Sequence, residues 1–201
     1  PLLVGERTNV LGSRVFKGII AAGDYEGAAE VGRAQLRAGA QVLDVCLQDP
    51  DRDELVDVER LLDKLVRVVK APLMIDSTDA KVMERALTWC QGKSILNSIN
   101  LEDGLARFEK VVPLGRRFGA AFVVGLIDET GMAVTVERKL EVARRSYRIL
   151  TEEMAVAPED IWWDPLVLPC GTGDEDPASG QRRHAATSRT IAGSSLAPSD
   201  W

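Results

Sequence analysis

The sequence runs APLMIDST from residue 71 to residue 78. An apolar run here ends abruptly in the carboxylate of Asp76, and a helical pattern with a candidate N-cap at Asp79 follows it. We expect a strand over 72–76 and a helix over 79–90. Such a unit is typical of a parallel sheet, because parallel neighbours need a long crossover and a helix is the usual one.

The same pattern recurs along the chain. Six apolar runs end in a carboxylate or an amide, and five of them lead into a helical pattern. The other expected strands cover 2–6, 41–46, 94–97, 119–126 and 161–164. Further helices are expected between Asp24 and Gly39, over about 53–69, after a cap at Asn100 and over about 135–154.

This cadence predicts an α/β protein with the (β/α)8 barrel fold of TIM type, incomplete, with about six β/α units within residues 1–173. A Rossmann sheet is the competing architecture. It is disfavoured because GERTNVLG at 5–12 does not supply a G-x-G-x-x-G turn after the first strand.

The periodicity stops after Gly173. Residues 174–201 are dense in Ser, Ala, Arg, Gly and Pro, and we expect a disordered C-terminal tail there. The tail has two explanations, a flexible linker or a loss of the reading frame. The second is favoured, because a complete barrel needs two more strands. The chain begins at Pro1 and not at a methionine, so we expect an excised or incomplete piece, and the two missing strands predict that it is truncated at the C-terminus.

The composition limits the partners. A net charge of −6 argues against nucleic acid, because phosphate binding needs basic surfaces. No apolar stretch is long enough to span a membrane, and no signal peptide opens the sequence. Three widely spaced cysteines show no metal-ligand pattern. We expect a cytoplasmic protein without a metal, a nucleic-acid partner or a membrane partner.

The polar residues at the strand ends are the candidate site. In parallel sheets of this kind ligands bind at the carboxyl ends of the strands. A carboxylate after a strand often only caps the next helix. Because Asp79 and Asn100 are expected to fill that role, Asp76 and Asn97 are left to face the barrel mouth. The candidate ligand-binding residues, suited to a ligand rich in hydrogen-bond donors, are Glu6, Asn9, Asp44, Asp76, Asn97 and Asp164.

Eight motifs together resemble the pterin-binding family of (β/α) barrels and, within it, the methyltetrahydrofolate-binding module of cobalamin-dependent methionine synthases. The resemblance covers about residues 1–173. The motifs are GERTN (5–9), GAQVLD (39–44), MIDST (74–78), QGKSILNSI (91–99), GAA (119–121), DETG (128–131), YRILTEE (147–153) and DPLVLP (164–169).

The resemblance implies that Glu6, Asp76, Asn97 and Asp164 line a pterin pocket. It implies an enzyme, a methyltransferase that binds the substrate methyltetrahydrofolate and presents its methyl group to a reduced corrinoid (cobalamin), as in methionine biosynthesis. The corrinoid would come from another domain or from a separate corrinoid protein. The chemistry of the residues agrees, because one carboxylate can accept hydrogen bonds from a ring N–H and an exocyclic amino group of a pterin.

Two departures from the family pattern affect this interpretation. The G-x-S-N motif, whose Asn the family places near N5 of the folate, is missing, so no catalytic residue is assigned and we expect this piece alone to be poorly active. Cys46 stands where many relatives have Asn, and we expect it to be a core residue. The alternatives are another pterin enzyme, such as dihydropteroate synthase, or an inactive truncated fragment.

Overall fold

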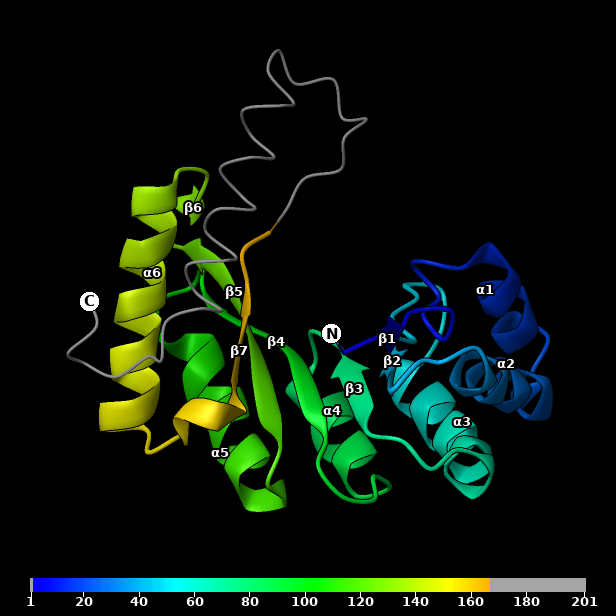
Figure 1. The fold of residues 1–201 in the computed structure, drawn as a ribbon. Coiled ribbons are helices and arrows are strands. Elements are labelled where there is room, and N and C mark those ends of the chain that lie inside the picture. The colour runs from blue at the N-terminus through cyan, green and yellow to red at the C-terminus, as the bar shows by residue number, and fades with distance from the viewer. Residues whose placement is uncertain (1, 167–201) are drawn as a thin grey trace, which may run out of the picture. The chain divides into compact units, whose positions relative to one another are not determined.

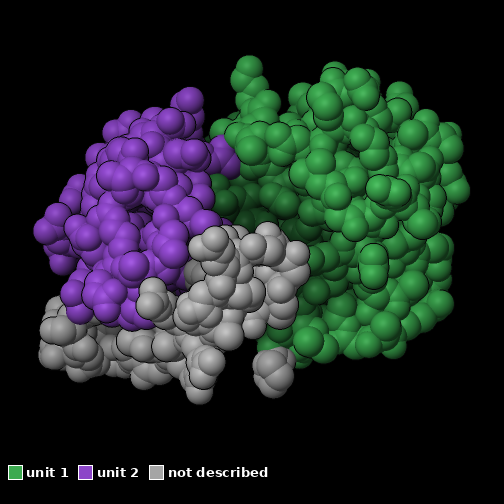
Figure 2. Space-filling model, turned by 90° about the horizontal axis from the view of Figure 1, so that it is seen from above, with its two compact units in different colours: residues 1–98, 114–121 green, residues 99–113, 122–201 purple. Residues whose placement is uncertain are grey.

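The computed structural model describes residues 2–166, and Figure 1 shows their helices and strands. The chain divides into two compact units, coloured separately in Figure 2. Unit 1 comprises residues 1–98 and 114–121, and unit 2 comprises residues 99–113 and 122–201. The predicted break at Gly173 and the predicted tail over 174–201 lie outside the described residues.

Unit 1 alternates strands and helices. Its strands β1, β2 and β3 and the first part of β4 pair in parallel, each with the next one along the chain. At the start of β5, Ala121 donates its N–H to the carbonyl of Ser94 at 2.8 Å, and both residues belong to unit 1. The elements are β1 (Val4–Gly5), α1 (Arg14–Ala21), α2 (Tyr25–Arg37), β2 (Val42–Val45), α3 (Glu54–Val68), β3 (Leu73–Asp76), α4 (Ala80–Leu87) and β4 (Ile95–Leu101).

The helices of unit 1 form a row in which α1 packs on α2, α2 on α3 and α3 on α4 (Figure 1). The buried face of α3 carries Val58, Leu61, Leu62 and Leu65, at the three- and four-residue spacing that the sequence shows. The expected N-caps are confirmed for two helices. Asp24 accepts a hydrogen bond from the N–H of Gly27, and Asp79 accepts one from the N–H of Lys81.

In unit 2, β5 pairs with β7 in parallel and with β6 in antiparallel orientation. Helix α6 packs on this strand group through Val142 and Ala143, which contact Leu126 of β5. Helix α5 (Ala106–Phe118) belongs to both units by sequence. The other elements are β5 (Ala121–Asp128), β6 (Gly131–Met132), α6 (Val136–Arg148), a π-helical turn (Ile149–Glu153), a 3-10 turn (Pro158–Asp160) and β7 (Ile161–Asp164).

All six expected strands are present, and the β/α alternation is confirmed. The expectation that Asn100 caps a helix is wrong, because Asn100 lies inside β4 and α5 begins only at Ala106. The Oδ1 atom of Asn100 accepts a hydrogen bond from the N–H of Glu102 at 3.0 Å. An Asn in such a local turn has the same sequence signature as a helix cap, which explains the error.

Among the α-helices and strands of the described residues, two have no counterpart in the sequence prediction, α1 and β6. Helix α1 has only eight residues and buries only Phe16 and Ile20, so its periodicity is too short to be detected. Strand β6 has two residues and follows β5 through the turn at Glu129 and Thr130. Within the described residues, no helix is long and apolar enough to cross a membrane.

Candidate functional site at the carboxyl ends of the strands of unit 1

The segment that follows β1 runs along the end of β2. Val10 donates its N–H to the carbonyl of Cys46 at 3.0 Å, and Cys46 donates its N–H to the carbonyl of Thr8 at 3.2 Å. The buried hydroxyl of Thr8 donates to the carbonyl of Asp44 at 2.5 Å and accepts from the amide of Gln35 in α2 at 3.2 Å. These bonds fix the GERTN motif over the carboxyl end of β2.

Asn9 joins two carboxylates. Its Nδ2 donates to Oδ2 of Asp44 at 2.8 Å and to Oδ2 of Asp76 at 3.3 Å. Its Oδ1 accepts from the backbone N–H groups of Leu11 at 2.8 Å and Gly12 at 3.0 Å. Because the carbonyl end of the amide is held by two donors, its NH2 end must face the two carboxylates.

Strand register places the remaining polar side chains on the same face. Asp44 is paired with Met74, two residues before Asp76, and Asp76 is paired with Asn97. Because side chains alternate between the two faces of a strand, Asp44, Asp76 and Asn97 project to the same side of the sheet. The structure therefore brings Asp44, Asp76 and Asn97 together with Asn9 at the carboxyl ends of β2, β3 and β4.

Asp44 carries the largest perturbation in this cluster. Its residue surface is only 3% exposed, and its Oδ1 has no hydrogen-bond partner among the described residues. Burial, together with the negative charges of Asp76 and Glu6, raises the pKa of Asp44 to about 7, although Asn9 and Asn97 partly offset this rise. A buried carboxylate oxygen without a donor is a vacant acceptor, which a ligand N–H can fill.

Asp76 is also perturbed in the direction of its neutral form. Burial raises its pKa, and the charge of Glu6 adds to the rise, whereas Asn9 and the thiol of Cys46 oppose it. Glu6 is exposed and reaches the cluster through its charge. The contributions to Asp44 and Asp76 come from carboxylates, amides and a thiol, with no cation among them in the described part of the chain.

Two further residues contribute to this electrostatic environment. Cys46 is buried, as the sequence predicts, and Glu54 was missed by sequence reasoning. Cys46 is 1% exposed, and burial raises its pKa to about 12, so the thiol stays protonated. Burial also raises the pKa of Glu54 at the start of α3, and the charges of Asp79 and Asp76 add to the rise. The position of Cys46, two residues after Asp44 in a strand, was the one signal that could have placed it beside the site.

The sixth predicted site residue, Asp164, ends β7 and belongs to unit 2. It is partly exposed, and its Oδ1 accepts a hydrogen bond from the N–H of Leu166 at 2.8 Å. The convergence of Asp164 with the five predicted residues of unit 1 stays a prediction.

The acids of the DETG motif have a different environment. Asp128 is 3% exposed and accepts from the N–H of Thr130 at 3.1 Å and from its hydroxyl at 2.8 Å. Arg138 of α6 pairs with the same carboxylate. Arg145 makes two bonds of 2.7 Å to Glu129. These acids attach α6 to the end of β5, which is a structural role.

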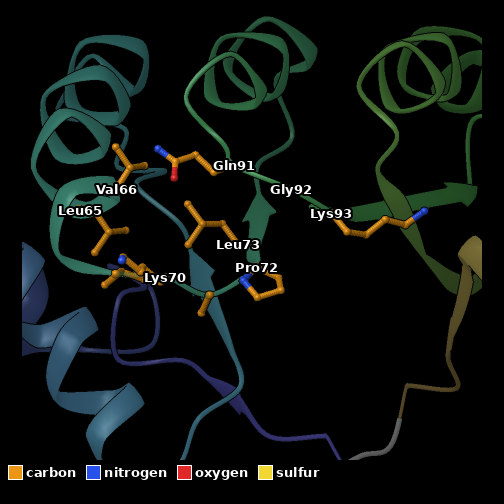
Figure 3. Close-up of a pocket in the computed structure, with 10 residues that line it drawn as sticks. Leu65, Val66, Lys70, Pro72, Leu73, Gln91, Gly92 and Lys93 are labelled. Carbon is orange, nitrogen blue, oxygen red and sulfur yellow. The ribbon is translucent and has the colours of Figure 1, made fainter.

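A pocket of about 360 Å³ lies at the opposite, amino-terminal end of β3. Leu73 at the start of β3 and the segment Gln91–Lys93 before β4 line it, with aliphatic side chains of α3 (Figure 3). Because ligands of parallel β/α folds bind at the carboxyl ends of the strands, this pocket is not the candidate site. Residues 2–166 contain no group of three or more His, Cys, Asp or Glu side chains arranged to hold a metal ion.

Comparisons with known proteins agree with this architecture. The family model described as "Pterin binding enzyme" matches residues 5–199. A dihydropteroate synthase from Yersinia pestis with a pterine–sulfa conjugate is similar at 12% identity, with 96% of this chain and 68% of that chain covered and a TM-score of 0.65. The enzyme from Xanthomonas albilineans in complex with 7,8-dihydropteroate is similar at 18% identity, with 96% and 69% covered and a TM-score of 0.64. The chain thus spans about two thirds of the length of these structures, and at this identity the likeness shows the fold.

Proposed function

The chain belongs to the family of pterin-binding enzymes, and from this premise we propose that it binds methyltetrahydrofolate and presents the methyl group for transfer to a reduced corrinoid. The observation that carries the proposal is the pair of carboxylates Asp44 and Asp76, joined by the amide of Asn9 at the carboxyl ends of β2 and β3. The GERTN and DETG motifs favour the methyltransferase branch of the family.

The cluster is suited to the donor-rich edge of a reduced pterin. That edge carries a ring N–H beside an exocyclic amino group, and a carboxylate can accept from both. The partnerless Oδ1 of Asp44 and the half-buried carboxylate of Asp76 supply acceptors. Asn97 can both donate and accept, so it suits a ring edge with an N–H and a C=O side by side.

In this proposal the chain's own residues bind and orient the folate. Asn9, held by Leu11 and Gly12, fixes the spacing of the two carboxylates before the ligand arrives, which lowers the entropic cost of binding. The carboxyl of Asp44, with a pKa of about 7, can hold or release a proton near neutral pH. The corrinoid, supplied by another domain or protein, would provide the nucleophile for the methyl group.

Dihydropteroate synthase is the second candidate, because the similar solved structures are enzymes of that name. That reaction joins a pterin pyrophosphate to an aryl amine, and a pyrophosphate calls for cationic side chains. Asp44 and Asp76 suit the pterin ring of either substrate. The similar solved structures therefore favour this candidate, whereas the GERTN and DETG motifs favour the first.

Calorimetric titration of the 201-residue chain with two ligands separates the candidates. The first is 5-methyltetrahydrofolate and the second is 6-hydroxymethyl-7,8-dihydropterin pyrophosphate. The proposal predicts tighter binding of the first, and it predicts that Asp76→Asn, Asn97→Ala and Asp164→Asn each weaken that binding at least about tenfold, or about 1.4 kcal/mol.

Asp63→Asn, on the solvent side of α3, is the matched control and should leave the affinity unchanged. Preference for the pyrophosphate would replace the first candidate by the second. Binding of neither ligand, or equal affinity in all the variants, would refute pterin recognition by these residues.

A further inference from the structure

Gln35 connects α2 to the segment that follows β1. It lies near the end of α2 and is half-buried. Its Oε1 accepts a hydrogen bond from the backbone N–H of Arg7 at 2.7 Å, and its Nε2 donates to Oγ1 of Thr8 at 3.2 Å. Because the acceptor end and the donor end of the amide have different partners, the orientation of the Gln35 side chain is fixed.

Thr8 extends this contact to β2. The residue is fully buried, and its hydroxyl donates to the carbonyl of Asp44 at 2.5 Å. A hydroxyl has one proton, so the bond that Thr8 receives from Gln35 must use a lone pair of the oxygen. The two bonds therefore form a directed chain from α2 through Thr8 to the backbone of Asp44, whose carboxylate belongs to the candidate site.

Gly5 leaves room for Gln35. A Cβ atom at Gly5 would lie 2.8 Å from Oε1 of Gln35 and 3.1 Å from the Cβ of Ala40. The first distance is shorter than van der Waals contact, so a larger residue would displace the amide from the N–H of Arg7. The sequence thus has a glycine at the point where the amide approaches β1 closely.

The segment that Gln35 holds also carries Asn9. Asn9 directly follows Thr8, and its side-chain amide is the donor that the two carboxylates of the candidate site share. Backbone hydrogen bonds to Cys46 hold this segment against β2, and the amide of Gln35 holds it from the side of α2. A displacement of Thr8 would therefore move Asn9 relative to the two carboxylates.

We propose that Gln35 is a positioning residue, whose amide holds the backbone before Asn9 and thereby places the Asn9 side chain between the two carboxylates. The consequence for pterin binding rests on the proposed function, whereas the placement of Asn9 does not. A site whose support is fixed by hydrogen bonds loses less freedom when a ligand binds. Gln35 touches no ligand in this proposal and acts through Asn9.

The placement of Asn9 is tested without a ligand. The full chain has three asparagines, whose side chains are labelled with 15N and observed by NMR. Gln35→Met removes both hydrogen bonds at nearly the same side-chain length. The Asn9 resonance should then shift, and its NH2 protons should exchange with water about fivefold faster, the factor that one typical hydrogen bond contributes. The Asn100 side chain, which bonds to Glu102 in unit 2, is the internal control. An unchanged Asn9 resonance would overturn the proposal.

Gly5→Ala tests the same contact with the Gln35 amide retained. The added methyl group meets the end of a flexible side chain, so the fold should tolerate it while Oε1 is pushed away from the N–H of Arg7. The Asn9 resonance should shift in the direction seen for Gln35→Met. Gly18→Ala, at a position with nothing within 4 Å, is the matched control and should leave it in place. No shift in Gly5→Ala would also overturn the proposal.

The effect on binding is tested by a double-mutant cycle with 5-methyltetrahydrofolate. Gln35→Met should weaken binding about tenfold in the wild-type background and have no further effect in the Asn9→Ala background. Gln91→Met, the same change at an exposed position before β4, is the control and should bind like the wild type. An equal loss in both backgrounds would show that Gln35 acts only on the fold and would refute positioning. If the wild type binds no pterin, the proposed function fails, and the NMR measurement still decides whether Gln35 places Asn9.

Discussion

Two groups of acids lie at strand ends in this protein, and the same sequence pattern introduces both. In unit 1, Asp44 and Asp76 are joined by the amide of Asn9 and are influenced by a further carboxylate, that of Glu6. In unit 2, Asp128 and Glu129 are paired with arginines of the following helix. The pKa of Asp44 is raised and the pKa of Asp128 is lowered, so the two groups have opposite electrostatic environments.

The difference shows what separates a binding site from a structural contact. An acid after an apolar run is structural when the next helix supplies a cation that reaches it, as Arg138 does for Asp128. It is available to a ligand when its neighbours are amides and other acids, because the acceptor atoms are then not occupied by cations. The number of residues between such an acid and the next arginine therefore helps to distinguish a structural acid from a binding acid, which the strand pattern alone cannot do.

The largest effect is expected for the pH dependence of Asp44. Its folded-state pKa of about 7 lies above the ordinary value of 3.8, so its contribution to stability is complete below about pH 4 and is lost as the pH rises to about 7. The rise corresponds to up to about 4 kcal/mol. Asp44→Asn should match the wild type near pH 4 and exceed its unfolding free energy at pH 8, as measured by urea denaturation. A variant that is less stable than the wild type at pH 8 would contradict this account.

The second effect is the opposite behaviour of Asp128. Burial alone would raise its pKa, but the bonds from Thr130 and Arg138 lower it overall, so its contribution is present above about pH 4 and lost on further acidification. Asp128→Asn should lower the unfolding free energy at pH 7 by about 2 kcal/mol, less than for a fully buried pair because Arg138 is partly exposed. Urea denaturation of Asp128→Asn and Asp44→Asn in parallel provides the comparison. If the unfolding free energy at pH 8 changed in the same direction in both variants, the electrostatic environments of Asp44 and Asp128 would not differ as described.

The third prediction concerns Asn9. Asn9→Ala removes the donor between Asp44 and Asp76, and the affinity for 5-methyltetrahydrofolate should fall about tenfold because the two carboxylates lose their fixed spacing. Gln41→Ala is the matched control, since it removes an amide that bonds Leu3 at the other end of β2. Equal affinities of Asn9→Ala and Gln41→Ala would remove Asn9 from the site.

The smallest effect is expected for Glu129. Its bidentate pair with Arg145 is exposed, and the guanidinium lowers the pKa of Glu129 to about 2. Exposed pairs contribute little to stability, so Glu129→Gln should change the Tm by about 1 °C or less. Differential scanning calorimetry measures this, and a decrease as large as that of Asp128→Asn would assign Glu129 a greater structural role than its exposure indicates.

Most of the fold could be predicted from the sequence, because its strands and helices leave local signals. These signals are the amphipathic pattern of α3 and the apolar runs that precede Asp44, Asp76, Asn97 and Asp164. The predictions that failed concern short elements and turns. Helix α1 has too few turns to show a period, and Asn100 forms a local turn instead of a cap. These outcomes depend on a few local bonds that the residue types alone do not fix.

The site was predicted in its residue types but not in its physical state. The sequence places Asp44 and Asp76 at strand ends, and parallel register then brings them together. The raised pKa of Asp44 depends on burial and on the charges of Asp76 and Glu6, which are properties of the folded chain. The protonated thiol of Cys46 and the two hydrogen bonds of Gln35 could not be predicted for the same reason.

The most direct test of the central claim is a 13C NMR spectrum of the aspartate carboxyl groups with increasing 5-methyltetrahydrofolate. The account predicts that the resonances of Asp44 and Asp76 move with saturation while that of Asp128 stays in place. Movement of Asp128 alone, or of the backbone around Leu73 and Lys93 with Asp44 and Asp76 unchanged, would contradict the claim that a pterin binds at the carboxyl ends of β2 and β3.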